Sequence, residues 1–287
     1  MITFKKNNTT RIVRPWDDSI NGKSNDWIKC TSCGTLIYHK QLKENLNVCP
    51  KCNFYFKMKA IDRIESLIDQ DTFIEHSKDM KSIDILEFND QKPYKKRLLD
   101  AENKTGINEA IVTGTGKIEG YDAAVGVMDF DFIGGSMGVV VGEKVFNLVE
   151  NADKESLPLV IVSSSGGARM QEGMFSLIQM ARTSGAICKF HNNNGLYISI
   201  FTNPTTGGVL ASFSFLGDII ISEPGATIGF AGARVIDQTI KQKVQPKQQT
   251  SELFLNNGFI DKIVERKNIK KVVGRLLYFY ELGKKRK

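Results

Sequence analysis

The sequence predicts an α/β domain with a largely parallel β-sheet, preceded by a small cysteine-rich module. From Glu109 onward, short apolar runs typical of buried strands alternate with longer stretches that favour helices, which indicates βαβ units. Ahead of this region, four of the five cysteines form two closely spaced pairs. We therefore divide the chain into a polar tail over residues 1–26, a cysteine module over 27–56 and a main domain over 57–287.

The cysteine module has the spacing of a zinc ribbon. Two Cys-x2-Cys pairs, separated by 15 residues, contain Cys30, Cys33, Cys49 and Cys52. Residues that favour tight turns accompany both pairs, namely Gly34, Pro50 and Asn53. Four thiolates close a tetrahedral site, so we expect one structural Zn²⁺ per chain and no metal catalysis. Two disulfides or unrelated thiols are the alternatives, and both spacings argue against them.

Composition limits the class of protein. Of the 287 residues, 41% are hydrophobic and 25% charged, which is ordinary for a globular chain. No apolar run approaches 18 residues, and residues 1–14 contain no apolar signal segment, so we expect neither a membrane span nor secretion. The fifth cysteine, Cys188, is expected to be a buried thiol. The net charge of +7 fits a polyanionic partner, a solvated basic surface or a phosphorylated small molecule.

The main domain begins with helical and loop-like sequence over residues 58–105. Its apolar stripe of Ile61, Ile64, Leu67 and Ile68 is interpreted as core packing, and 92–104 as a charged connector. Beyond it, strands are expected at 110–118, 121–130, 159–163, 196–201, 218–222, 227–230 and 259–264. Helices are expected at 140–152, 168–190, 208–216 and 268–282.

Glycine pairs mark the junctions where predicted strands give way to helices. The first junction lies at Gly166-Gly167, the second at Gly207-Gly208, and a third cluster spans 133–138. Consecutive glycines allow close approach of the backbone, and a helix N-terminus offers unpaired N–H groups, so such junctions suit an oxyanion. A tight junction without a ligand is the alternative. The first junction lacks the Gly-x-Ser-x-Gly and Gly-Lys-Ser/Thr patterns, which excludes a nucleophile elbow and a P-loop.

Side chains give no sign of a catalytic triad. His39 lies in the cysteine module, His76 in the connector region and His191 in a predicted polar loop, so none falls in a glycine motif. Arg169 and Glu172 lie three residues apart and are interpreted as an intrahelical ion pair. The three junctions therefore suggest chemistry by backbone amides.

Four segments in a fixed order carry a family resemblance. They are Gly134-Gly135-Ser136-Met137-Gly138, the run from Ser164 to Gly173, the run from Pro204 to Val209, and Glu223-Pro224 with Ile228 to Gly232. With the cysteine module they resemble, over residues 27–283, the β subunits of bacterial-type acetyl-coenzyme A carboxylase carboxyltransferases. The resemblance implies a crotonase-like (ClpP-like) β-β-α superhelix with an N-terminal four-cysteine zinc ribbon. Ala233, where the family often has Lys or Arg, and Ser163, where small residues vary, are minor departures.

The resemblance implies transfer of a carboxyl group from carboxybiotin on a carrier protein to acetyl-CoA, giving malonyl-CoA for fatty acid synthesis. It also implies that the biotin ureido anion removes the acetyl proton, so that the protein must mainly stabilise carbonyl oxyanions. Gly166 and Gly167 are assigned to one oxyanion hole, and the carbonyl that it serves is left open. Other glycines are expected to line the same cleft, namely Gly207 and Gly208, or the CoA pantetheine, namely Gly134, Gly135 and Gly138.

The resemblance also implies partners, because the chain has room for only one crotonase-like half. A separate carboxyltransferase α subunit is expected, in an α2β2 assembly, with a biotin carboxyl carrier protein and a biotin carboxylase as further partners. The expected cofactors are Zn²⁺ and the biotin of the carrier. A Lys, Asn and Ile bias fits an AT-rich bacterium or an organelle genome, so the expected location is the bacterial cytoplasm or the plastid stroma.

Two other functions are weighed. A carboxyltransferase subunit of another biotin-dependent acyl-CoA carboxylase or decarboxylase shares the glycine motifs but is not expected to carry the ribbon. A zinc-ribbon nucleic-acid-binding regulator fits the surrounding lysines and the aromatic run Phe54, Tyr55 and Phe56, which could stack on bases. It leaves the glycine junctions unexplained, so nucleic acid is retained only as a secondary partner. Packing of the aromatics between ribbon and main domain is favoured over stacking.

Overall fold

The computed structural model describes residues 26–230 and 249–284, which fall into two compact units, Met1–Lys57 and Met58–Lys287. Most of the predicted polar tail lies outside the described residues. So do Ala233 and the last two residues of the segment that ends at Gly232.

The first unit is a two-stranded hairpin with one short helix. Strands β1 (Trp27–Lys29) and β2 (Leu36–Tyr38) pair antiparallel, and α1 (His39–Glu44) follows directly. Left-handed backbone at Gly34 and Asn53 closes the two tight turns, as the sequence predicts. The small core of this unit consists of Cys30, Ile37, Leu42, Cys49 and Phe56.

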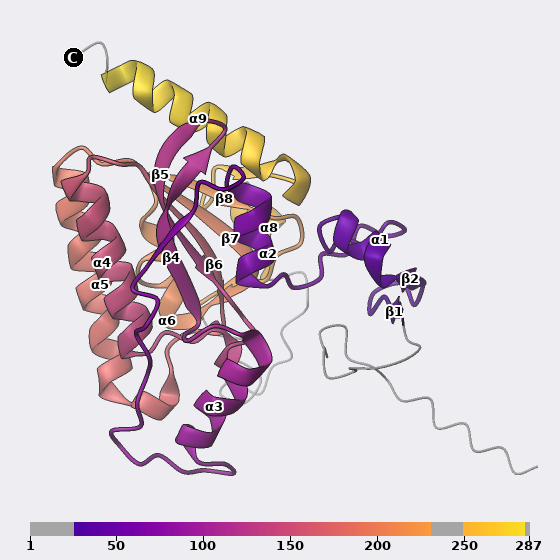
Figure 1. Ribbon diagram of the computed structural model, residues 1–287. Helices are drawn as coiled ribbons and strands as arrows, with labels where there is room; N and C mark the ends of the chain where they lie inside the picture. The colour runs from indigo at the N-terminus through magenta and orange to yellow at the C-terminus, as the bar shows by residue number, and fades with distance from the viewer. Residues whose placement is uncertain (1–25, 231–248, 285–287) are drawn as a thin grey trace, which may run out of the picture. The chain divides into compact units, whose positions relative to one another are not determined.

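The second unit is built on a mixed eight-stranded sheet with the order β10-β8-β7-β6-β5-β4-β3, and β9 lies beside β7 (Figure 1). From β5 to β10 neighbouring strands are parallel, whereas β3, β4 and β5 are antiparallel. The strands are β3 (Ile74–His76), β4 (Ile111–Ile118), β5 (Tyr121–Met128), β6 (Leu159–Ser165), β7 (Tyr197–Thr206), β8 (Ile219–Ser222), β9 (Ile228–Gly229) and β10 (Lys262–Ile263).

Helices cover both faces of this sheet. Helices α4 (Val139–Lys154) and α5 (Met174–Asn192) pack on one face, and α2 (Ala60–Leu67) and α9 (Ile269–Lys284) on the other (Figure 1). The central strands are buried on both sides, which explains their nearly continuous apolar sequence. The remaining helical segments are α3 (Tyr94–Thr105), α6 (Gly207–Leu210), α8 (Ser251–Asn256) and single 3-10 turns at Ile133–Gly135, Met170–Glu172, Ser214–Leu216 and Arg266–Asn268.

Parallel pairing brings the predicted junctions to one edge of the sheet. Strands β6 and β7 run side by side and end at Ser165 and Thr206, so the residues that follow them emerge next to each other. The carboxyl edge of a parallel sheet is the usual position for a binding site in α/β proteins.

Four expectations from the sequence are wrong. The charged connector is helix α3, because its charges lie on one side while Tyr94, Leu98 and Ala101 face the core. The helix expected over 168–190 is interrupted at Gly173, whose left-handed backbone separates a 3-10 turn from α5. On α5, Cys188 is exposed rather than buried, and His191 belongs to the last turn rather than to a loop.

Candidate active site and metal centre

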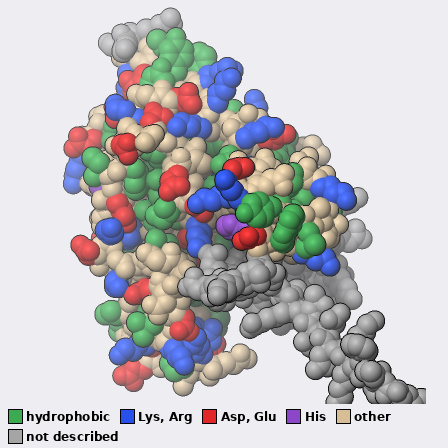
Figure 2. Space-filling view, turned by 45° about the vertical axis from the view of Figure 1, so that its right-hand side comes forward, with side chains coloured by type: hydrophobic (Ala, Val, Ile, Leu, Met, Phe, Trp, Pro, Cys, Tyr) green, Lys and Arg blue, Asp and Glu red, His purple; other side chains and the backbone are tan. Residues whose placement is uncertain are grey.

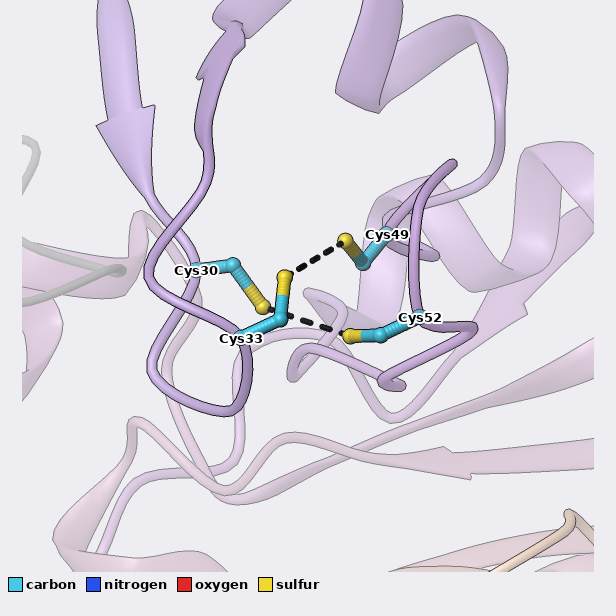
Figure 3. A group of neighbouring side chains, drawn as sticks. All are labelled: Cys30, Cys33, Cys49 and Cys52. Atoms are coloured by element: carbon cyan, nitrogen blue, oxygen red, sulfur yellow. Dashed lines mark hydrogen bonds between the residues drawn. The ribbon is translucent and has the colours of Figure 1, made fainter.

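The four cysteines of the first unit converge on one point (Figure 3). Their sulfur atoms all lie within 4.8 Å of one another. The Sγ atoms of Cys30 and Cys52 are 3.7 Å apart, and those of Cys33 and Cys49 are 3.9 Å apart.

These distances fit zinc and not disulfides. A tetrahedral Zn²⁺ with Zn–S bonds of about 2.3 Å separates its sulfur ligands by roughly 3.8 Å, whereas a disulfide bond is about 2.05 Å long. The turn after β1 supplies Cys30 and Cys33, and the turn closed by Asn53 supplies the other pair. The donor set is closed, which indicates a structural metal.

Two side chains of the aromatic run, Phe54 and Phe56, pack inside this unit. Phe56 belongs to its core, and the ring of Phe54 meets the Phe56 ring edge-on, with centroids 5.1 Å apart. On the face shown in Figure 2, the Lys and Arg side chains of the described residues are interspersed with Asp and Glu. Both observations weaken the nucleic-acid interpretation of the charge and the aromatics.

In the second unit, the first and third glycine segments are hydrogen-bonded to each other. The N–H of Gly166 donates to the carbonyl oxygen of Gly134 at 2.8 Å, and the N–H of Met137 donates to that of Gly167 at 2.9 Å. The N–H of Arg169 donates to the carbonyl oxygen of Met137 at 2.9 Å. The third segment is thus fixed along the junction that follows β6.

At Gly167 and Gly207 the second junction meets the first backbone to backbone. A Cβ placed on Gly167 would lie 3.2 Å from the Cα of Gly207 and from the nitrogen of Gly208. In return, a Cβ on Gly207 would lie 3.0 Å from the Cα of Gly167. Both glycines also have positive φ, 122° and 61°, so a side chain at either position would be crowded and would strain the backbone.

The structure specifies which amides of this cluster are occupied. Gly166 donates to Gly134, and Gly167 donates to the hydroxyl of Ser165 at 2.9 Å. An oxyanion bound to either N–H would therefore have to replace or share an internal acceptor. Gly207 and Gly208 open helix α6, and the first N–H groups of a helix have no acceptor within it.

The glycines expected along the pantetheine have close partners in the chain itself. A Cβ on Gly135 would lie 2.0 Å from the carbonyl oxygen of Ser164, and one on Gly138 would lie 2.5 Å from the carboxylate of Glu172. Gly134, by contrast, has open space around its Cβ position. Close packing against the Ser164 carbonyl and the Glu172 carboxylate thus accounts for two of these three glycines, and their role toward CoA stays a prediction.

A buried charged cluster adjoins the first junction, and the sequence analysis missed most of it. Arg169 is fully buried and forms two hydrogen bonds with the carboxylate of Glu109, at 2.5 and 3.0 Å. Glu172 lies 3.6 Å from the guanidinium, so the predicted pair exists as a secondary contact outside a regular helix. Glu109 is 60 residues away from Arg169 in the sequence, so no local spacing could have indicated this pairing.

A second buried cluster explains the Glu223-Pro224 segment. The Glu223 carboxylate lies between the guanidinium groups of Arg63 and Arg266, each 2.7 Å away, and all three side chains are buried. Burial favours the neutral carboxyl, but the two arginine charges more than offset this effect and lower the pKa of Glu223. The cluster joins α2, the end of β8 and the 3-10 turn before α9.

Comparison with known protein families agrees with the fold and the cysteine centre. A model of the carboxyl transferase domain matches residues 57–268, and a model of the acetyl-CoA carboxylase zinc finger domain matches residues 27–52. The chain is therefore a carboxyl transferase domain preceded by a zinc-finger module.

Curated relatives narrow the family. The acetyl-coenzyme A carboxylase carboxyl transferase subunit beta of Trichodesmium erythraeum is 52% identical over 255 residues, covering 89% of this chain and 78% of the relative. The chloroplastic subunit of Pyropia yezoensis is 50% identical over 258 residues, covering 90% of each chain. The chain belongs to the family of acetyl-coenzyme A carboxylase carboxyl transferase β subunits.

Solved structures with the same fold include larger assemblies. Transcarboxylase 12S, with methylmalonyl-coenzyme A and methylmalonic acid bound, matches with a TM-score of 0.64 and 26% identity. The match covers 77% of this chain but only 40% of that chain. The Pseudomonas malonate decarboxylase MdcD–MdcE hetero-dimer matches in fold, with a TM-score of 0.59 and 19% identity over 77% of this chain and 86% of that chain.

Proposed function

We propose that the chain supplies one half of a carboxyltransferase site that moves a carboxyl group from carboxybiotin on a carrier protein to acetyl-CoA, forming malonyl-CoA. The observation that carries this proposal is the meeting of three glycine segments at the carboxyl edge of the sheet, in a chain of the acetyl-CoA carboxylase β-subunit family. The match to the acetyl-CoA carboxylase zinc finger favours acetyl-CoA over other acyl-CoA substrates.

In this proposal the chain acts through its backbone. Carboxybiotin would supply the carboxyl group as CO2, and the ureido anion left behind would remove the acetyl proton before the resulting enolate takes up that CO2. Amides at the glycine segments stabilise the negative charge that develops on a carbonyl oxygen, and donors of this kind are the largest single contribution in many enzymes. The N–H groups of Gly207 and Gly208 lie at the start of α6, whereas those of Gly166 and Gly167 serve only by exchange of their present acceptors.

The residues of the zinc finger have a structural role in this proposal. One Zn²⁺ bound by Cys30, Cys33, Cys49 and Cys52 would supply the folding energy of a unit whose apolar core is very small. Four sulfur ligands leave no position for substrate.

The missing half of the site is assigned to a separate α subunit in an α2β2 assembly. The exposed side of α5 offers a surface for it, because Met174, Phe175, Leu177 and Ile178 are all exposed there. Contiguous exposed apolar side chains on a soluble protein mark interaction sites. This surface starts one turn after the first glycine junction, so a subunit that completes the site would cover it.

A cavity of about 250 Å³ opens beside this surface, lined mainly by apolar side chains that include Leu86, Val139, Val140 and Phe175. Its size suits one large apolar side chain of the partner. The carrier protein and biotin carboxylase are assigned as transient partners. Among the residues that the structure describes, no helix has the length and apolar character to cross a membrane. We assign the protein to the bacterial cytoplasm or plastid stroma, the compartments of the enzymes that it resembles.

The decisive experiment is malonyl-CoA decarboxylation in the presence of biocytin, with and without the α subunit. We expect substantial turnover only from the two subunits together, because half the cleft is absent from the lone chain. Full turnover by the lone chain would contradict the two-subunit site. If the two subunits fold and assemble but neither the complex nor the lone chain turns over malonyl-CoA, the proposed reaction is contradicted.

A further inference from the structure

Tyr94 is the buried residue that joins the two charged side chains next to the first glycine junction. It begins helix α3, some 75 residues before Arg169, and its side chain is fully buried. Its hydroxyl donates to Oε1 of Glu172 at 2.6 Å and accepts from Nη1 of Arg169 at 3.2 Å. Burial is the main cause that raises the pKa of Tyr94, so the hydroxyl keeps its proton and the role of donor.

Each of these two partners fixes a different part of the site. Arg169 directly follows the Gly166–Ala168 backbone, which pairs with Met137 in a short parallel bridge. Oε2 of Glu172 accepts from the N–H of Val139 at 2.6 Å, at the positive end of the 16-residue helix α4. The Tyr94 hydroxyl therefore connects the glycine junction with the start of α4.

The charges of this cluster do not depend on Tyr94 for their pairing. Arg169 keeps both Glu109 oxygens, the hydroxyl and carbonyl of Ser136 and the hydroxyl of Ser82 when the phenol is removed. Glu172 keeps the Val139 N–H. Because no buried charge loses all its partners, replacement of Tyr94 by Phe should alter geometry more than folding.

We infer that Tyr94 is a positioning residue for carboxyl transfer, which sets the Gly166–Ala168 junction relative to helix α4. The inference rests on the proposed function. Amide donors stabilise a transition state only where they meet the developing charge, and a misplacement of about 1 Å can cost about 100-fold in rate. Tyr94 itself does not contact the reacting atoms in this scheme.

The test compares Tyr94→Phe with Tyr197→Phe, each assembled with the α subunit. Tyr197 is a matched control, because it is equally buried, lies at the opposite end of β7 and has only a 3.5 Å hydroxyl contact, to Ser199. We expect Tyr94→Phe to lower kcat about ten- to 100-fold with KM for malonyl-CoA within about twofold of the wild type. Tyr197→Phe should leave both constants within about twofold.

A double-mutant cycle separates positioning from general destabilisation. Glu172→Gln removes the charge at the other end of the same hydrogen bond, so the losses in kcat from Tyr94→Phe and Glu172→Gln should combine to much less than their product. Unchanged kcat in Tyr94→Phe, an equal loss in Tyr197→Phe, or fully multiplicative losses would overturn the inference. If Tyr94→Phe does not assemble with the α subunit, the assembled Glu172→Gln variant becomes the test. A lowered kcat with unchanged KM then supports the inference, and an unchanged kcat overturns it. An inactive wild-type complex would instead count against the proposed function.

Discussion

The Cα of Gly207 lies only 3.2 Å from the position that a Cβ on Gly167 would take. Because the ends of β6 and β7 meet at this point, each glycine limits the position of the other junction. The contact gives the two glycine motifs, 40 residues apart, one shared structural cause.

Because of this contact, we expect substitution of Gly167 to cost more activity than substitution of a glycine that has only a positive φ. Gly167→Val should lower turnover by about two to three orders of magnitude, the scale of losing an oxyanion donor, because its side chain would displace Gly207 and Gly208. The control is Gly120→Val at the β4–β5 turn, where φ is also positive but the Cβ position is open. Initial rates at saturating substrate, with circular dichroism for folding, measure both. Equal losses in the two variants would show that backbone strain alone is responsible.

The cysteine centre should hold one zinc per chain. Cys49→Ala should lose the metal and unfold the first unit, while the second unit keeps its own core and its far-ultraviolet spectrum. Metal analysis of the pure protein measures the stoichiometry, and Cys188→Ala is the control, since Cys188 lies on α5 and outside the cluster. Less than half an equivalent in the wild type, or full retention in Cys49→Ala, would refute this site.

The apolar side of α5 should govern assembly with the α subunit. Ile178→Asp places a charge on a side chain that is 54% exposed in the lone chain, and we expect the dissociation constant to rise at least about tenfold. Phe279→Asp is the control, because Phe279 is 60% exposed on α9. Sedimentation analysis across a concentration series measures both. If only Phe279→Asp weakens the complex, the partner binds elsewhere.

The Glu223 cluster should contribute stability that depends on pH. Glu223→Gln removes the carboxylate that lies between two buried guanidinium groups, and we expect a loss of about 3–5 kcal/mol in unfolding free energy near pH 7. Because the folded-state pKa is lowered, this contribution is fully present above about pH 4.5 and disappears as the pH falls through the folded-state value. Urea unfolding at several pH values measures it. A wild-type advantage that does not shrink in acid would contradict the assignment.

Local sequence patterns predicted the features of the fold that are set by residues close together in the chain. The cysteine spacing, the turns at Gly34 and Asn53, and the alternation of strands and helices all follow from residues close together in the chain. The resemblance supplied the family and the crotonase-like fold. Tyr94, Glu109 and the acceptor of the Gly166 amide escaped prediction because each depends on segments that only the folded sheet brings together.

The exposed side of α5 also has a consequence for the supply of the protein. A helix that presents Met174, Phe175, Leu177 and Ile178 to water is stabilised by mass action whenever its partner is abundant, and is prone to self-association when it is not. In the proposed assembly, synthesis of the two subunits in equal amounts would keep this surface covered, independent of any demand for turnover. A shortage of α subunit would leave β chains open to aggregation or proteolysis.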